Sequence, residues 1–469
     1  MRIRLIEPEP PGLHVYAKVI LPRLGLPIIG AALKAHGHDV LIYHPHLAPI
    51  NWDDVYTADL VGLSSTTSTT PAAYAMADDL REHGIPVVIG GSHVTFLADE
   101  ALEHATYVAR GEGGEQLMLE LIEALEGRRE LSSITGLSYM QEGLAVHNPP
   151  RELCADLDAL PFPDLGLIVG KPGGTTPIMT SWGCPFACNF CSVTAMFGRK
   201  YRFRSAENVI AEIKEKRPKR IFFYDDNFAA NKKRLKRLLQ MMIDENLVVP
   251  WYAQVRTDVV RDPELLDLMR RSGCQIVYLG LESVSQETLD HYEKSQTVED
   301  IERAIRLLHE HSILCHGMFV LGAEPDTVAT VRDTVAFALK NRIDTVMLNI
   351  LTPLPGTPQF RELNEAGRIF DKRWQLYDAH HVVFRPKGMS PYELQIEVLR
   401  GYMRFYSMRS WLRCLFAVRA TQQLVFHWWG RTIIRTWMRD ERNKAFVAAL
   451  KSMLPQPARP GTESAPTSH

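Results

Sequence analysis

The sequence predicts an α/β protein with two parallel-sheet domains and a mostly helical carboxyl-terminal region. Short apolar runs alternate with amphipathic helical stretches through residues 3–127, and a second such series begins near 176. A chain of 469 residues is also too long for one ordinary core. The division that we expect is a first domain, a linker, a barrel, a helical region and a disordered tail, at 1–150, 151–175, 176–360, 361–453 and 454–469.

The first series predicts a doubly wound, Rossmann-like sheet. Its expected strands are 3–8, 39–45, 60–66, 85–91 and 107–113, and its expected helices are 26–37, 72–84, 98–105 and 115–127. Ligands of such sheets bind at the carboxyl ends of the strands. The segments at those ends, 64–70, 90–96 and 110–115, are rich in small residues that let a bulky ligand approach the backbone. A hairpin is expected over 134–150.

The second series predicts an incomplete parallel barrel. Six strand–helix units are expected, with strands at 176–182, 220–226, 251–256, 275–283, 315–322 and 344–353. In βα barrels the chemistry lies at the carboxyl ends of the strands. Residues that follow these strands are therefore the first candidates for a site.

Three cysteines, Cys184, Cys188 and Cys191, directly follow the first strand of this second series. Gly183 and Pro185 disfavour a regular helix there and favour a loop wrapped around a metal centre. An iron–sulfur cubane held by three thiolates would leave one iron free for another ligand. The alternatives are a zinc site completed by a distant cysteine or histidine, and three unrelated buried thiols.

The spacing C-x-x-x-C-x-Φ-C after the first barrel strand resembles the radical S-adenosylmethionine (SAM) superfamily. The resemblance implies a 4Fe–4S cluster whose open iron is chelated by SAM. It also implies SAM contacts by Phe190, Asp225, Asp226, Arg256 and Glu282. The alternatives are a helix cap at Asp226 and its neighbour, and a salt bridge between Arg256 and Glu282 across the barrel mouth.

The first domain resembles the cobalamin-binding domain of cobalamin-dependent radical SAM enzymes. The resemblance implies cobalamin contacts by Ser64, Ser65, Thr66, Gly90, Gly91, His93, Gly111, Glu112 and Gly113. The chain lacks the Asp-x-His-x-x-Gly segment whose histidine ligates cobalt in many cobalamin proteins. His93 is therefore interpreted either as a polar contact to the corrin or its tail, or as a satisfied local histidine.

The two resemblances together imply a C-methyltransferase that acts on an unactivated carbon through a 5′-deoxyadenosyl radical. They imply a small-molecule substrate and a reductant such as flavodoxin or ferredoxin. One alternative keeps the cofactors but performs oxidative cyclisation or rearrangement, of a tetrapyrrole-like or lipid substrate. The alternative from another class is a noncatalytic iron–sulfur sensor or electron carrier.

The composition predicts a cytoplasmic protein. The net charge of −2 disfavours a nucleic-acid partner, and seven cysteines in so long a chain are not a secreted disulfide framework. The sequence contains no uncharged apolar run of about 18 residues or more, so no transmembrane span is expected.

Residues 404–439 form the exception to this ordinary composition. The segment contains seven arginines, at positions 404, 409, 413, 419, 431, 435 and 439, four tryptophans, at positions 411, 428, 429 and 437, and no Asp or Glu. It predicts either peripheral membrane contact, which would favour a hydrophobic substrate, or a helical cap on the barrel.

Overall fold

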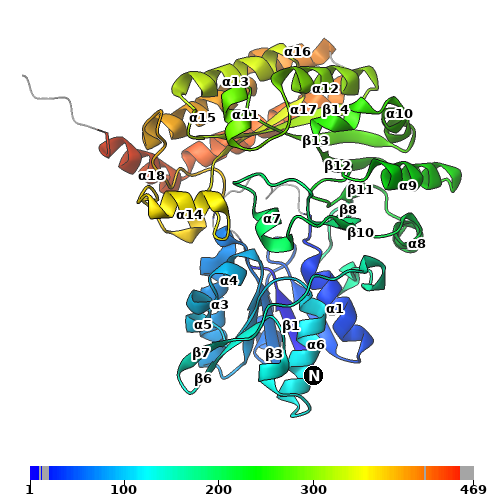
Figure 1. The fold of residues 1–469 in the computed structure, drawn as a ribbon, viewed down its shortest axis with the longest axis vertical. Coiled ribbons are helices and arrows are strands. Elements are labelled where there is room, and N and C mark those ends of the chain that lie inside the picture. The colour runs from blue at the N-terminus through cyan, green and yellow to red at the C-terminus, as the bar shows by residue number, and fades with distance from the viewer. Residues whose placement is uncertain (10–11, 13–20, 417–418, 455–469) are drawn as a thin grey trace, which may run out of the picture.

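The computed structural model describes residues 1–9, 12, 21–416 and 419–454. The predicted disordered tail lies outside the described residues except for Leu454. Figure 1 shows the first domain, in blue and cyan, below the barrel, in green, with helix α7 between them. The helical carboxyl-terminal region packs on the barrel, and the predicted fold class is confirmed.

The first domain contains a seven-stranded sheet in the order β2-β1-β3-β4-β5-β6-β7. Its strands are β1 (Arg2–Ile6), β2 (Asp39–Tyr43), β3 (Leu60–Ser64), β4 (Val87–Gly90), β5 (Tyr107–Ala109), β6 (Leu137–Gln141) and β7 (Leu144–His147). The pairings among β1 to β5 are parallel, whereas β6 and β7 pair antiparallel. The expected hairpin therefore extends the sheet, which the sequence did not predict.

Helices cover both faces of this sheet. They are α1 (Gly25–Ala35), α2 (Trp52–Val55), α3 (Thr70–Glu82), α4 (Ser92–Phe96), α5 (Ala98–His104) and α6 (Gly114–Leu125). Helices α1 and α6 pack together over one core cluster, and α3 and α5 pack over another. This is the arrangement of a doubly wound domain, in which each face of the sheet buries its own apolar side chains.

The barrel is a sheet of six parallel strands in sequential order. They are β8 (Thr176–Ile178), β11 (Ile221–Phe223), β12 (Trp251–Val255), β13 (Cys274–Glu282), β14 (Leu314–Leu321) and β15 (Thr345–Ile350). Outside it lie α8 (Ala206–Lys216), α9 (Lys232–Asp244), α10 (Pro263–Arg271), α11 (Gln286–His291), α12 (Val298–Glu310) and α13 (Val328–Lys340). Strands β8 and β15 are the two edges, so the barrel is incomplete, as predicted.

A short antiparallel ribbon interrupts the barrel series after β8. Strand β9 (Ser181–Trp182) pairs with β10 (Arg202–Phe203), and helix α7 (Ser192–Phe197) lies between them in the chain. The ribbon closes the base of the segment that carries the three cysteines. That segment is therefore held at both ends.

The carboxyl-terminal helices follow the barrel in the chain, and those over 391–405 and 420–439 pack against β15 at its open edge. They are α14 (Pro358–Glu365), α15 (Pro391–Phe405), α16 (Met408–Arg413), α17 (Ala420–Arg439) and α18 (Glu441–Ser452). The hydroxyl of Tyr402 accepts from the backbone N–H of Leu348 at 2.7 Å, and that of Tyr406 bonds both the N–H and the carbonyl of Val346 at 3.0 Å. These bonds satisfy edge groups of β15 that would otherwise be unpaired. No helix in the described part of the chain has both the length and the apolar composition needed to cross a membrane.

Candidate active site

The carboxyl ends of the two sheets face each other. Helix α4, which follows β4, packs on α7 of the cysteine segment. The ring of Phe96, at the end of α4, lies against Gly356 in the loop after β15. Gly356 has a φ of +87°, and a Cβ there would lie 2.6 Å from that ring, so only glycine fits. The segment after β4, one of those predicted to hold cobalamin, therefore lies next to the cysteine segment.

The three cysteines lie on one loop between β9 and α7. All three side chains are partly accessible, and the backbone N–H of Cys191 donates to the carbonyl of Cys188 at 3.1 Å. Gly183 begins the loop with a φ of +82°, where a Cβ would lie 2.7 Å from the carbonyl oxygen of Lys200. Glycine is thus required for the loop to close over the ribbon.

The thiols form one group. Burial, together with the nearby Cys188, Asp226 and Cys184, raises the pKa of Cys191 to about 12. Among the described residues, no three Cys, His, Asp or Glu side chains converge closely enough to hold a single metal ion. In a cubane each thiolate binds a different iron, so its cysteines lie farther apart than the ligands of one ion. Three thiols on one short loop fit that group.

Asp225 and Asp226 follow β11 but have different surroundings. Asp225 is fully buried, and its carboxylate accepts from the backbone N–H of Thr180 at 3.2 Å, from its hydroxyl at 2.8 Å and from the hydroxyl of Ser181. Asp226 is exposed and lies close to the cysteines. The protein atoms that surround its carboxyl group, and next the negative charge of Asp225, raise its pKa to about 7. Of the two aspartates, only Asp226 is free to meet a ligand.

The alternative interpretation of Asp226 and Asn227 as the N-cap of a helix is wrong. Helix α9 begins at Lys232, and its cap is Asn231, whose side chain accepts from the backbone N–H of Arg234 at 3.1 Å.

Arg256 and Glu282 do not form the salt bridge that was the alternative to a SAM site. The guanidinium of Arg256 lies 3.7 Å from the ring centroid of Phe186, in the cysteine loop. Glu282 instead accepts from the ammonium of Lys294 at 2.5 Å, and both side chains are nearly buried. Lys294, which follows α11, could not be predicted as part of this site, because nothing in its local sequence pattern marks it.

Glu282 has an unusual backbone for its residue type. Its φ is +61°, and the register between β13 and β14 shifts between Gly280 and Glu282. A Cβ at Gly280 would lie 2.6 Å from the Glu282 carboxylate and 2.9 Å from the Lys294 nitrogen. Strain of this kind persists where the surroundings enforce it, and it is common at functional sites.

Phe190 packs within the cysteine loop. Its ring makes an edge contact with Tyr292, with centroids 4.7 Å apart, and its neighbour Asn189 donates to the carbonyl of His291 at 3.0 Å. These contacts hold the loop against the end of α11.

The predicted cobalamin loops come together at one edge of the first sheet. Gly91 has a φ of +120°, and a Cβ there would lie 2.0 Å from the carbonyl oxygen of Ser65. The loops after β3 and β4 are also joined by two bonds to the carbonyl of Gly90, from the backbone N–H of Ser65 at 2.9 Å and from its hydroxyl at 3.5 Å. The other predicted residues of this edge that are not buried are Ser64, Thr66, Gly90, Gly111 and Gly113.

His93 is buried in a network that joins the first domain to the carboxyl-terminal region. Its Nε2 lies 3.2 Å from Glu100 Oε1, which also accepts from the hydroxyl of Tyr74 at 3.0 Å. The indole N–H of Trp374 donates to Glu100 Oε2 at 3.1 Å, and its ring lies 4.9 Å from that of His93. These contacts engage Nε2 of His93, whereas its Nδ1 is buried without a hydrogen-bond partner. Both interpretations of His93 stay predictions.

Glu112 is engaged by the barrel. Its carboxylate forms a bidentate ion pair with Arg202, at 2.5 and 2.6 Å, and accepts from the backbone N–H of Cys154 at 3.1 Å. A corrin contact by Glu112 stays a prediction.

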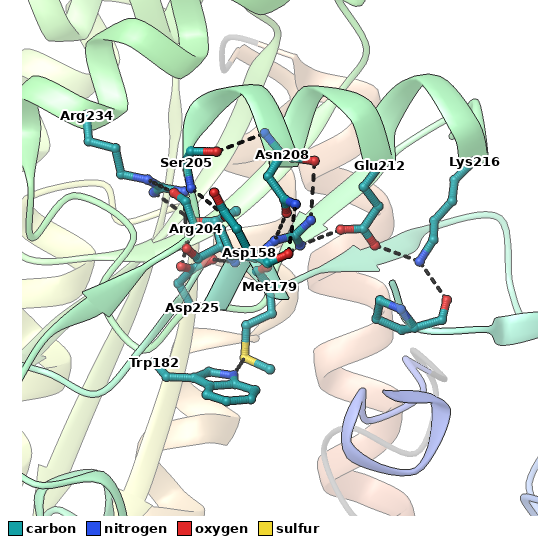
Figure 2. A network of polar contacts seen from close by, with 12 residues as sticks. Asp158, Met179, Trp182, Arg204, Ser205, Asn208, Glu212, Lys216, Asp225 and Arg234 are labelled. Atoms are coloured by element: carbon teal, nitrogen blue, oxygen red, sulfur yellow. Dashed lines mark hydrogen bonds and ion pairs between the residues drawn. The ribbon is translucent and has the colours of Figure 1, made fainter. Parts of the chain in front are cut away.

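The predicted linker is bound to the barrel and is not a free tether. Figure 2 shows Asp158 accepting from the backbone N–H of Ser205 at 2.8 Å, beside Arg204. Arg204 donates to Glu212 at 2.5 Å and to the carbonyl of Met179, at the end of β8, at 2.8 Å. The linker, α8 and the base of the cysteine loop thus form one network.

Comparisons with known proteins match both domains. The radical SAM superfamily matches residues 178–338, and the B12 binding domain matches residues 12–119.

Curated relatives match most of the chain. An uncharacterized methyltransferase of Pyrococcus horikoshii is 31% identical over 82% of this chain and 88% of its own length. The bacteriochlorophyllide d C-12(1)-methyltransferase of Chlorobaculum tepidum is 30% identical over 80% of this chain and 82% of its own. The anaerobic magnesium-protoporphyrin IX monomethyl ester cyclase of Rubrivivax gelatinosus is 31% identical over 81% and 73%, respectively.

Two solved structures share the fold. The radical SAM methyltransferase TsrM from Kitasatospora setae, with cobalamin and a 4Fe–4S cluster bound, matches with a TM-score of 0.64 at 21% identity, over 78% of this chain and 75% of its own. The cobalamin-dependent radical SAM enzyme OxsB matches with a TM-score of 0.69 at 16% identity, over 96% and 75%.

Proposed function

Because this chain belongs to the cobalamin-dependent radical SAM enzymes, we propose that it is a C-methyltransferase acting on an unactivated carbon of a small molecule. The observation that carries the proposal is the packing of α4 on α7, which sets the predicted cobalamin loops beside the cysteine loop. The cofactors of this family supply a 5′-deoxyadenosyl radical and a transferable methyl group. A substrate between the two domains would be within reach of both.

The proposed roles of the chain's own residues follow from their surroundings. Cys184, Cys188 and Cys191 hold the cluster, and the accessible Asp226 accepts from the SAM amino group. Arg256, fixed on Phe186, provides positive charge for the SAM carboxylate.

Two further residues complete the proposed SAM site. Glu282 is oriented by Lys294 to accept from the ribose hydroxyls. Phe190 presents its backbone near the adenine, because its ring is fixed by Tyr292.

Oxidative cyclisation is the second candidate. A cyclase is as similar to this chain as the two methyltransferases are. The noncatalytic sensor is disfavoured, since the matching relatives and solved structures described above are named as methyltransferases, a cyclase and a radical enzyme.

Nucleoside products and substrate mass distinguish the two reactions. The chain, reconstituted anaerobically with iron, sulfide and cobalamin, is incubated with native extract, reductant and SAM carrying a deuterated methyl group. Methylation predicts 5′-deoxyadenosine and S-adenosylhomocysteine in similar amounts, and a new product carrying the deuterated methyl group. Cyclisation predicts 5′-deoxyadenosine without S-adenosylhomocysteine and a product without label. A Cys188→Ala variant should form neither nucleoside, whereas Cys414→Ser, which changes a buried thiol away from the site, should form both.

The proposal has two further partners. A flavodoxin or ferredoxin would deliver the electrons that radical formation requires. Peripheral membrane contact through residues 404–439 would suit a hydrophobic substrate.

A further inference from the structure

Exposed apolar side chains gather on α16, α17 and the turn between them. This region contains seven of the thirteen large hydrophobic residues exposed in the described part of the chain. They are Met408, Leu412, Leu415, Val425, Trp428, Trp429 and Met438. Trp428 is 58% exposed and Trp429 44%. Single exposed apolar residues are ordinary, but a group of this size on two packed helices marks an interaction surface.

Helix α17 is held by its opposite face. Gln423 donates to the carboxylate of Asp344 at 2.5 Å, and His427 Nε2 lies 3.2 Å from the Asp344 carbonyl. Ile434 and Trp437 continue this buried face toward the end of the helix. The helical-cap interpretation is therefore correct for one face of α17, and it leaves the outward tryptophans unexplained.

Helix α16 continues the outward face. The indole N–H of Trp411 donates to the carbonyl of Leu424 at 3.2 Å, which joins α16 to the first turns of α17. In Figure 1, α16 lies at the end of the molecule away from the first domain. The surface is thus remote from the contact between the two domains.

The charge of this surface has one sign. Five arginines of residues 404–439 are exposed and form no ion pair within the described part of the chain: Arg404, Arg409, Arg413, Arg435 and Arg439. The segment contains no Asp or Glu. On an ordinary solvated helix, acidic residues would alternate with basic ones.

We propose that the outward face of α16 and α17 binds the surface of an anionic lipid bilayer. Tryptophan prefers the headgroup level of a membrane, leucine and methionine enter the acyl boundary, and arginine pairs with lipid phosphate. A nucleic acid would offer phosphates but no apolar phase for Leu412 and Leu415. A second copy docked through the same face would set arginine against arginine. The inference does not depend on the reaction that the enzyme catalyses.

Co-sedimentation of the full chain with vesicles tests the proposal. We expect binding to phosphatidylcholine–phosphatidylglycerol vesicles at low salt, weakening as salt rises, and little binding to phosphatidylcholine alone. Each arginine near the surface is worth about fivefold in affinity. A triple variant, Arg409→Glu, Arg413→Glu and Arg435→Glu, should therefore bind at least tenfold more weakly. Arg431 is left unchanged because it is partly buried and donates to the carbonyl of Tyr406.

A second variant, Trp428→Ser with Trp429→Ser, removes the apolar part. It should bind more weakly at every salt concentration, since that part is not screened. Matched controls change exposed residues elsewhere: Lys233→Glu, Arg303→Glu and Lys340→Glu on the barrel helices, and Met140→Ser with Leu144→Ser on the hairpin. Both controls should bind as the unchanged chain does. 5′-Deoxyadenosine formation in detergent-free buffer should be unchanged in every variant, which separates this test from that of the reaction.

Equal recovery of the unchanged chain in the supernatant with both kinds of vesicle at low salt would overturn the proposal. Equal loss of binding in the controls would also overturn it, because attraction would then not be specific to this face. A concentration-dependent dimer that the tryptophan variant abolishes would assign the face to a second copy instead.

Discussion

Glu112 of the first domain and Arg202 of the barrel ribbon form a bidentate ion pair in which each side chain is only 4% exposed. Glu112 lies in a predicted cobalamin loop, and Arg202 follows the cysteine loop in the chain. The pair therefore joins a predicted cobalamin loop to the ribbon that closes the cysteine loop. The pair is rigid because two nitrogens of the planar Arg202 guanidinium donate to the two carboxylate oxygens of Glu112.

Removing one partner of this pair should be costly. Glu112→Ala leaves the Arg202 guanidinium buried without a counter-charge, and we expect a loss of about 3 kcal/mol in unfolding free energy. Urea denaturation of the cofactor-free chain measures it. The double variant Glu112→Met with Arg202→Met should recover much of that loss. A double variant whose loss equals the sum of the single losses would show that the two residues do not act as a pair.

The adjacent aspartates should behave differently. Asp226→Asn should weaken SAM binding about tenfold, since it removes a charge-assisted hydrogen bond, while the cluster content stays the same. Asp225→Asn should instead reduce stability by about 3 kcal/mol, because Asp225 joins β11 to the end of β8 beside the Arg234 guanidinium. Equilibrium dialysis with SAM and urea denaturation distinguish the two. If Asp225→Asn weakened SAM binding strongly and Asp226→Asn did not, Asp225 and not Asp226 would be the SAM contact.

The fold could be predicted from the sequence because its signals are local. The strands of both sheets are short apolar runs, and the three cysteines all lie within residues 184–191. The hairpin was predicted too, but not that β6 pairs with β5, which depends on residues far apart in sequence.

The fine structure of the site depends on partners that no local pattern reveals. Whether Asp225 or Asp226 meets a ligand follows from which one Thr180 and Ser181 bind. Lys294 becomes part of the site only because the barrel brings it to Glu282. Trp374 reaches Glu100 across 274 positions of the chain.

The network around His93 predicts the state of the cobalt. Because Glu100 binds His93 and Trp374 covers it, His93 should not reach the metal. The electron paramagnetic resonance spectrum of bound cob(II)alamin should therefore show no nitrogen splitting from a protein imidazole. His93→Gln should leave the spectrum unchanged. Splitting that this variant removes would identify His93 as a cobalt ligand and contradict the assignment.

The carboxyl-terminal region contains a buried pair that predicts a pH dependence. His381 Nδ1 lies 2.9 Å from the carboxylate of Asp378, and its Nε2 lies 3.1 Å from the side-chain oxygen of Asn443 in α18. Burial disfavours the charged forms of both His381 and Asp378, but the attraction between the two charges is stronger than this effect. The pKa of His381 is raised, through Asp378 and the bond to Asn443, and that of Asp378 is lowered to about 2 by His381 and His380.

The sign of the effect follows from linkage. A histidine whose pKa is raised by folding stabilises the fold fully below its unfolded value, about 6.5, and loses that contribution as the pH rises through the folded value. The aspartate contributes above its unfolded value, near 4, and loses its contribution only as the pH falls toward 2. Stability should therefore fall between about pH 6 and pH 9 as this histidine loses its charge. Urea denaturation at both pH values should show a smaller decline in His381→Gln than in the unchanged chain, whereas His83→Gln, at an exposed histidine of the first domain, should leave the decline as it is. An equal decline in all three chains would show that the pair does not control the pH dependence.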